Sequence, residues 1–265
     1  MSIVRLFVFL ALVASSVPLL SQEPPTKSRR DPMLLDVLTR VINAAGGAQA
    51  LASVRDLTET GEITFHWGEG HKGPVTIQTL GGNHFRMEAD LSEGKHTWVV
   101  NDGNGTKKEA DQKASLLSSE NAINLVNLTF PITQVAAVLA DSKTDVSLVG
   151  IETRDSRSIY RLRVKGELGL SSRPIPTLPV VKDFVIDALN FTILSVEDRP
   201  FRTYEAGGKL SDKPSREIDF GDYRTVSGVL VPFSISTKLL GQQTLSIHLT
   251  NVIFNSNLNT EDFKN

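Results

Sequence analysis

The sequence predicts a mainly β protein of α+β type, in which short helices cap a large, curved antiparallel sheet. Three observations carry this prediction: apolar and polar residues alternate strictly along many segments, turn-forming residues separate those segments, and helical spacing is confined to the start of the chain and one internal stretch. About eleven segments are predicted as strands, and a sheet of that size tends to curl or close rather than stay flat.

The N-terminus has the organisation of a secretory signal peptide over residues 1–21. Arg5 precedes the apolar run 6–13, and Ala14 and Ser16 then stand at a −3/−1 spacing, with a later cleavage candidate at residue 21. An uncleaved anchor is the alternative, but the run is short compared with the roughly 20 apolar residues of a membrane span. We therefore expect export across the inner membrane into the periplasm.

Residues 22–30 (QEPPTKSRR) are polar and proline-rich, which is typical of a flexible linker. Residues 31–265 are predicted as a single domain. Within it, Asp31 and Pro32 are typical of a helix start, an apolar stripe follows at helical spacing, and Gly46–Gly47 ends the helix. A short second helix is expected around Leu51.

The predicted strands follow, joined mostly as a meander by hairpin-type turns. They span residues 57–67, 75–80, 84–91, 97–100, 146–152, 158–165, 181–187, 191–198, 217–223, 229–239 and 245–253. One helical stretch, 116–139, interrupts them, and Pro131 divides it into two short helices.

Composition narrows the function classes. The 265 residues include 28 Lys plus Arg and 30 Asp plus Glu, for a net charge of −2, and such a balance argues against nucleic-acid binding. The absence of cysteine excludes disulfides, thiolate metal sites, a cysteine nucleophile and lipidation on cysteine.

Motifs for catalysis and metal binding are weak. The stretch 68–73 matches the glycine-rich G-x-G-x-x-G pattern, but strands are predicted on both sides, so a hairpin loop is favoured over a nucleotide site. His66, Glu69 and His71 lie close enough in sequence to consider a metal, although solvated histidines on the sheet surface are the simpler interpretation. We expect no enzymatic activity, no cofactor and no metal.

A strongly curved sheet presents every second side chain to its concave side, where capping helices can enclose an apolar ligand cavity. The alternative is that the same side chains fill a packed core. The predicted lining from the strands is Phe65, Trp67, Phe85, Met87, Val231, Phe233 and Ile235, and the predicted helical lid contributes Leu125, Leu128, Phe130 and Val135.

Five segments carry a resemblance to known proteins: NAAGGAQAL, VRDLTETGEITF, HFRMEADL, EGKHTWVVNDGNG and EIDFGDYRTVSGVLVPFSIST. In element order and turn placement the chain resembles the LolA/LolB lipoprotein-carrier-like superfamily, and more closely its secreted, outer-membrane lipoprotein-sorting-protein-like members, over residues 34–263. The resemblance implies an eleven-strand half-barrel covered by helices, with an apolar cavity for the acyl chains of lipoproteins or free lipids.

One departure from that family concerns the latch of the lid. The family's carrier has a basic residue and a proline before the strand that begins here at His84, and its arginine is tied to lid movement; this chain has Gly81 and Gly82 there. Arg86 lies on the same strand, but its alternation places it on the polar face. The latch chemistry is therefore not carried over.

The sequence thus predicts a soluble periplasmic carrier of lipid or acylated lipoprotein. Its expected partners are that cargo and an envelope membrane protein as donor or acceptor, and it is expected to be a monomer that binds no nucleic acid. The runner-up is a non-enzymatic structural or interaction module of the cell envelope, with a packed core and no ligand.

Overall fold

The alternating segments build one antiparallel sheet of thirteen strands in the computed structural model, which describes residues 30–67, 70–167, 179–199 and 215–264. The predicted signal peptide and all but the last residue of the predicted linker lie outside the described residues. The described elements belong to one compact unit, Asp31–Asn265.

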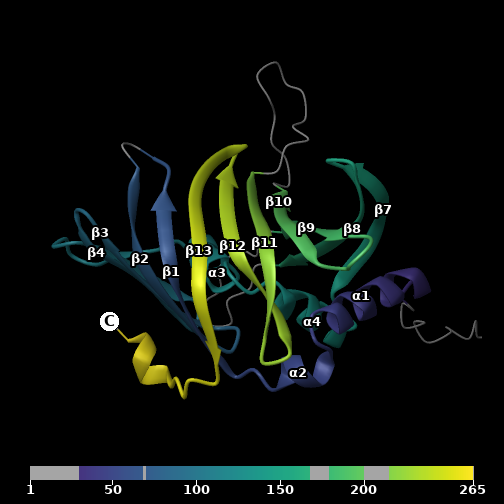
Figure 1. Cartoon of the computed structure of the whole chain (residues 1–265), viewed down its shortest axis with the longest axis horizontal. Coiled ribbons are helices and arrows are strands. Elements are labelled where there is room, and N and C mark those ends of the chain that lie inside the picture. The colour runs from purple at the N-terminus through teal and green to yellow at the C-terminus, as the bar shows by residue number, and fades with distance from the viewer. Residues whose placement is uncertain (1–29, 68–69, 168–178, 200–214, 265) are drawn as a thin grey trace, which may run out of the picture. The chain divides into compact units, whose positions relative to one another are not determined.

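The strand order is β6-β5-β4-β3-β2-β1-β13-β12-β11-β10-β9-β8-β7, so consecutive strands pair except β6 with β7, and β1 pairs with β13. The sheet curves strongly, and its outermost strands β6 and β7 do not pair with each other (Figure 1). The strands are β1 Asp56–Phe65, β2 His71–Leu80, β3 His84–Leu91, β4 Gly94–Asn101, β5 Asn104–Glu109, β6 Ser115–Leu116, β7 Asp145–Arg154, β8 Arg157–Glu167, β9 Pro179–Asp187, β10 Ile193–Arg199, β11 Arg216–Val226, β12 Val229–Leu239 and β13 Gln242–Phe254.

The predicted fold class is confirmed, with thirteen strands rather than about eleven. The two additional strands are β5 and β6, whose sequences lack apolar alternation. In β5 the apolar partner is supplied from elsewhere: Gly105 lies beneath Leu117 and Ala122, and the Lys107 ammonium lies 5.9 Å from the centre of the Trp98 ring. A polar sequence can therefore form this strand near the sheet edge, because Leu117 and Ala122 cover Gly105 while the strand's own Lys107 lies over Trp98 of β4.

The first helix begins and ends where the sequence predicted, whereas the internal helical stretch predicted from residue 116 begins at residue 119, because Ser115–Leu116 form β6. Asp31 caps α1 (Pro32–Ala44) by accepting a 2.9 Å hydrogen bond from the Met33 N–H, and α2 (Ala48–Ala52) follows. The internal helical stretch forms α3 (Ser119–Val126) and α4 (Ile132–Ala140) on either side of Pro131, and a 3₁₀ helix, Thr260–Phe263, closes the described chain. No helix among the described residues has the length and apolarity of a membrane span.

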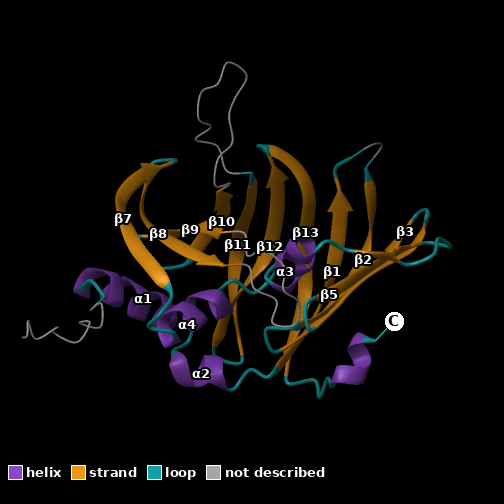
Figure 2. Ribbon diagram, turned by 180° about the vertical axis from the view of Figure 1, so that it is seen from behind, coloured by secondary structure: helices purple, strands orange, loops and turns teal. Residues whose placement is uncertain are grey.

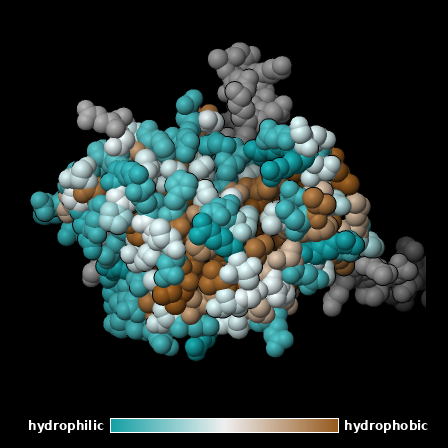
Figure 3. Space-filling model, viewed as in Figure 1, coloured by the Kyte–Doolittle hydropathy of each residue, from teal (hydrophilic) through white to brown (hydrophobic). Residues whose placement is uncertain are grey.

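The helices α1, α3 and α4 lie against one face of the sheet (Figure 2), and that face carries the core. Polar side chains cover most of the surface seen in Figure 3, with apolar ones in separate patches. The largest fully buried side chains are Leu34 and Leu38 of α1, Phe263, and the strand residues Leu57, Ile63, Ile77, Phe85, Met87, Ile159, Leu162, Phe184 and Ile186.

Two glycines on the apolar face let neighbouring strands approach closely. A Cβ atom on Gly61 would lie 2.2 Å from the His248 carbonyl oxygen, and one on Gly73 would lie 1.9 Å from the Asp90 carbonyl oxygen. The pairing of β1 with β13 also shifts register between Thr60 and Gly61. The bend of the sheet at these points therefore requires residues without a side chain.

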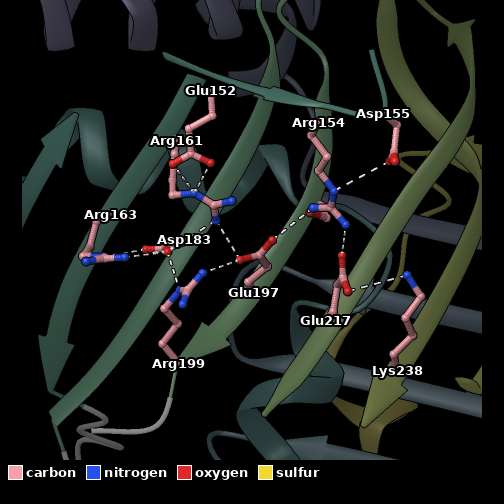
Figure 4. Close-up of polar contacts among 11 residues, drawn as sticks. Glu152, Arg154, Asp155, Arg161, Arg163, Asp183, Glu197, Arg199, Glu217 and Lys238 are labelled. Atoms are coloured by element: carbon pink, nitrogen blue, oxygen red, sulfur yellow. Dashed lines mark hydrogen bonds and ion pairs between the residues drawn. The ribbon is translucent and has the colours of Figure 1, made fainter. Parts of the chain in front are cut away.

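The opposite face of β7–β12 carries a chain of ion pairs that crosses six strands (Figure 4). Asp183 is fully buried and accepts hydrogen bonds from Arg163 (2.7 Å) and Arg199 (2.6 Å). Glu197 pairs with Arg161 (2.7 Å) and Arg154 (3.0 Å), and Arg154 continues to Glu217 of β11. Burial opposes the ionisation of Asp183, but the hydrogen bond and charge of Arg163, together with Arg199, outweigh it and lower the pKa of Asp183.

We expect Asp183→Ala to lower the free energy of unfolding at pH 7 by about 3–5 kcal/mol, because it removes a fully buried carboxylate from three partly buried arginines, Arg161, Arg163 and Arg199. Because the pKa of Asp183 is lower in the folded state, this loss should shrink as the pH falls through the range where the carboxylate is protonated. Urea unfolding between pH 3 and pH 8 tests both statements.

The matched control is Asp36→Ala, which removes the exposed 2.9 Å pair with Arg40 on α1 and should cost less than about 1 kcal/mol. Equal effects of the two substitutions would show that the ion pairs between the strands contribute no more than a surface pair.

Candidate functional site

An apolar cavity of about 430 Å³ lies where α2 and α4 meet the beginning of β1 and the end of β2. Its volume is within the roughly 300–1,000 Å³ range of small-molecule pockets. The lining residues are Ile42, Ala48, Leu51, Ala52, Val54, Arg55, Asp56, Leu57, Thr79, Gly81, Gly82, Phe130, Ile132, Thr133, Ala136, Leu139 and Ala140.

The spacing of the lining residues follows from helix geometry. In α4, Ile132, Ala136 and Leu139 are four and three residues apart, so they lie on one helical face and present it to the cavity. Several members of the lining are alanine or glycine. These small side chains leave the space between the helices and the sheet unfilled.

The corner that leads from α2 into β1 is fixed by residues about 200 positions later. The Arg55 N–H donates to the Asn255 side-chain oxygen (2.9 Å), and the Arg55 carbonyl accepts from the Gly81 N–H (3.1 Å). Asp56, 4 % exposed, accepts from both the N–H (2.6 Å) and the hydroxyl (2.8 Å) of Ser256. This side of the cavity is therefore held in place by backbone and side-chain hydrogen bonds.

Of the residues predicted to line a cavity, one lines the observed cavity and the others lie in the core or at the surface. Phe130 lines the observed cavity. The others do not: Trp67 lies beyond the end of β1 and is 53 % exposed, and the remaining six from the strands are buried in the continuous core. Those six are Phe65, Phe85, Met87, Val231, Phe233 and Ile235. They fill the space between sheet and helices because they are large and lie within the strands.

The other predicted lid residues also pack into the core and do not line the cavity. Leu128 and Val135 are buried, and Leu125 is partly buried against the same core. The predicted lid therefore contacts the sheet through these side chains, while Phe130 and α4 line the cavity.

The histidine and glycine motifs do not form a ligand site in the described residues. His71 pairs with Glu93 at 2.8 Å, and His66 hydrogen-bonds with Ser246 at 3.0 Å. Among the described side chains, no group of three or more His, Asp or Glu is placed to hold a metal ion. Gly68 and Glu69, which belong to these two motifs, lie outside the described residues, and the glycine-rich stretch 68–73 runs into strand β2 from His71 rather than into a phosphate-binding helix.

A buried carboxyl on the apolar face of β1 was not predicted. Glu59 of β1 is 0 % exposed, and neither carboxylate oxygen has a hydrogen bond of normal geometry. Burial raises the pKa of Glu59 to about 7, and the Thr129 hydroxyl offsets part of that effect. Residues 57, 59, 61, 63 and 65 share one face of a strand, so the period of two already places Glu59 on the apolar side.

We expect folding stability to fall between about pH 4.5 and pH 7, because over this range the unfolded chain ionises Glu59 while the folded chain keeps it protonated. Glu59→Gln should remove this part of the pH dependence. The free energy of unfolding of the variant, relative to that of the wild type, should increase by about 1–3 kcal/mol between pH 4 and pH 8. Chemical unfolding at each pH measures the difference, and parallel curves for the two proteins would contradict it.

No family model and no curated protein sequence matches the chain. Solved structures do. A LolA-superfamily protein from Nitrosomonas europaea has a TM-score of 0.53 at 12 % identity, covering 87 % of this chain and 97 % of that one. A putative outer-membrane lipoprotein-sorting protein domain from Vibrio parahaemolyticus has a TM-score of 0.51 at 10 % identity, covering 87 % and 95 %. A DUF1329-family protein from Desulfovibrio piger has a TM-score of 0.51 at 12 % identity, with the same coverage.

The chain therefore has the fold of LolA-like proteins, as the sequence resemblance implied. The similarity extends over most of each chain, so it concerns the whole sheet with its helices.

Proposed function

We propose that this protein is a periplasmic, non-enzymatic carrier that holds the acyl chain of a lipid or an acylated lipoprotein in the cavity between α2, α4 and the ends of β1 and β2. The single observation that carries the proposal is that cavity, which is apolar, about 430 Å³ in volume and open to solvent on one side. The shared fold with a putative lipoprotein-sorting domain supports it.

Binding would be driven by the transfer of methylene groups from water to the lining. Each buried methylene contributes about 0.8 kcal/mol. The apolar contact comes from Phe130, Leu139 and Leu51. The small side chains of Ala136 and Ala48 leave space for the ligand. No bond is made or broken in this scheme, so the protein needs no nucleophile and no cofactor.

A structural or interaction module of the envelope is the second candidate, and one observation favours it. Six of the residues predicted to line a cavity are instead packed into the core and at most 5 % exposed. Most of the space beneath the helices is therefore filled. The two candidates differ in whether the remaining cavity takes up a ligand.

Ala136→Trp tests the carrier function, because an indole at this position occupies the cavity. We expect the variant to lose at least tenfold in affinity for a fluorescent fatty acid, measured by titration of delipidated protein. The matched control is Ala137→Trp, on the adjacent and exposed position of the same helix and outside the lining, which should bind as the wild type does.

Circular dichroism and thermal unfolding of both variants establish that they fold. If the folded wild type takes up no acyl ligand, the carrier proposal is wrong and the packed module is favoured. If Ala136→Trp binds as tightly as Ala137→Trp, the ligand occupies another place.

Export is tested by fractionation and by the mass of the purified chain. We expect recovery from the periplasmic fraction with an N-terminus at Val17 or Gln22, after cleavage behind a small residue. A chain that retains Met1 and sediments with the membrane would contradict both the cleavage and the soluble state. Native mass spectrometry of the same sample reports whether the carrier is a monomer and whether a lipid, a lipoprotein or an envelope partner accompanies it.

A further inference from the structure

Arg55 is distinguished from the rest of the cavity lining by its charge and its lack of a partner. Arg55 and Asp56 are the ionisable residues among the described lining. Asp56 is buried and engaged by Ser256. The Arg55 side chain is exposed, and no described residue forms an ion pair or hydrogen bond with its guanidinium group.

The position of Arg55 is nevertheless fixed. Its N–H and carbonyl are bound by Asn255 and Gly81, and Asn255 also donates to the Ser53 carbonyl at 3.0 Å. The backbone of a cationic residue is thus fixed at the edge of an apolar cavity, and its flexible side chain offers five N–H donors to an incoming group. A guanidinium group pairs with carboxylate and phosphate in a two-point geometry.

The size of the cavity limits how much lipid it accepts. At about 430 Å³ it lies toward the lower end of the roughly 300–1,000 Å³ range of small-molecule pockets, which suits one acyl chain better than the three of a triacylated lipoprotein. The lipid part of a triacylated lipoprotein also carries no charge for Arg55 to bind.

We propose that the ligand is a single-chain amphiphile with an anionic head group, a carboxylate or a phosphate, whose chain fills the cavity while its head group binds Arg55. This rests on the proposed carrier function and narrows it to an anionic lipid rather than an acylated protein. The shared chemistry is a monoanionic or dianionic oxygen group at the end of one hydrocarbon chain.

The test compares ligands of one chain length: hexadecanoate, hexadecyl phosphate and hexadecanol, with a triacylated lipopeptide and inorganic phosphate as further probes. Affinities are measured by displacement of a bound fluorescent fatty acid, below the micelle concentration of each lipid. We expect the wild type to bind hexadecanoate or hexadecyl phosphate at least fivefold more tightly than hexadecanol, with no displacement by inorganic phosphate.

Arg55→Gln should lower the affinity for the anionic lipids about five- to tenfold and leave that for hexadecanol unchanged, because glutamine keeps the backbone hydrogen bonds. The matched control is Arg157→Gln. Arg157 is an exposed arginine at the turn into β8, outside this cavity, and also has no ion pair with a described residue. It should leave every affinity unchanged.

The outcomes separate the two proposals. Equal affinity of the wild type and Arg55→Gln for hexadecanoate, or tighter binding of the lipopeptide, overturns the anionic-lipid inference. The carrier function still stands in that case if Ala136→Trp abolishes binding. If none of the probes binds the wild type, the carrier function itself is wrong.

Discussion

An unclosed sheet with one apolar face cannot be left uncovered, and this constraint governs the rest of the structure. A closed barrel would bury that face on itself, but here the edge strands β6 and β7 do not meet. The helices therefore have to cover the apolar face of the sheet. They are short, and large side chains such as Phe85 and Phe233 fill most of the gap beneath them. Where the cover consists of alanines, at α2 and α4, space remains. The cavity is the part of the apolar face that the chain does not cover with its own side chains.

The two faces of the sheet achieve their stability by different means. On the apolar side, the packing of helix against strand excludes water. On the other side of β7–β12, alternating acids and arginines join strand to strand, with Asp183 and Glu197 each bound by more than one arginine. At the cavity wall, the start of β1 is held by the hydrogen bonds of Asp56 and Asn255, and β1 and β2 are joined further along by the Glu62–Lys72 ion pair. The strands and the cavity corner are thus supported by different residues, so substitutions in one can be made without direct effect on the other.

Most of the fold could be predicted from the sequence, whereas the site could be predicted only in part. The period of two reports burial on one face, and it identified the strands except β5 (Asn104–Glu109) and β6 (Ser115–Leu116), whose sequences do not alternate; in β5, Gly105 is covered by Leu117 and Ala122. The same pattern does not indicate where the cavity lies. Large apolar residues fill a core. A cavity occurs where the side chains are too small to reach across the space between helix and sheet, as at Ala136. Hydropathy does not record that difference, so of the predicted lining only Phe130 borders the cavity. Glu59 was accessible to the same reasoning, because it stands in step with Leu57 and Ile63.

The close approach at Gly61 and Gly73 has an evolutionary consequence. Most positions on the apolar face accept any of several hydrophobic residues, since volume and pattern suffice to fold a core. At these two glycines the backbone of the next strand occupies the place of the Cβ atom, so every other amino acid is excluded on steric grounds. The curvature of the sheet at these points therefore depends on a small number of positions that only glycine fits. Because most other positions are not restricted in this way, widely different sequences are compatible with the same curved sheet, and the solved structures that share this fold are 10–12 % identical to this chain.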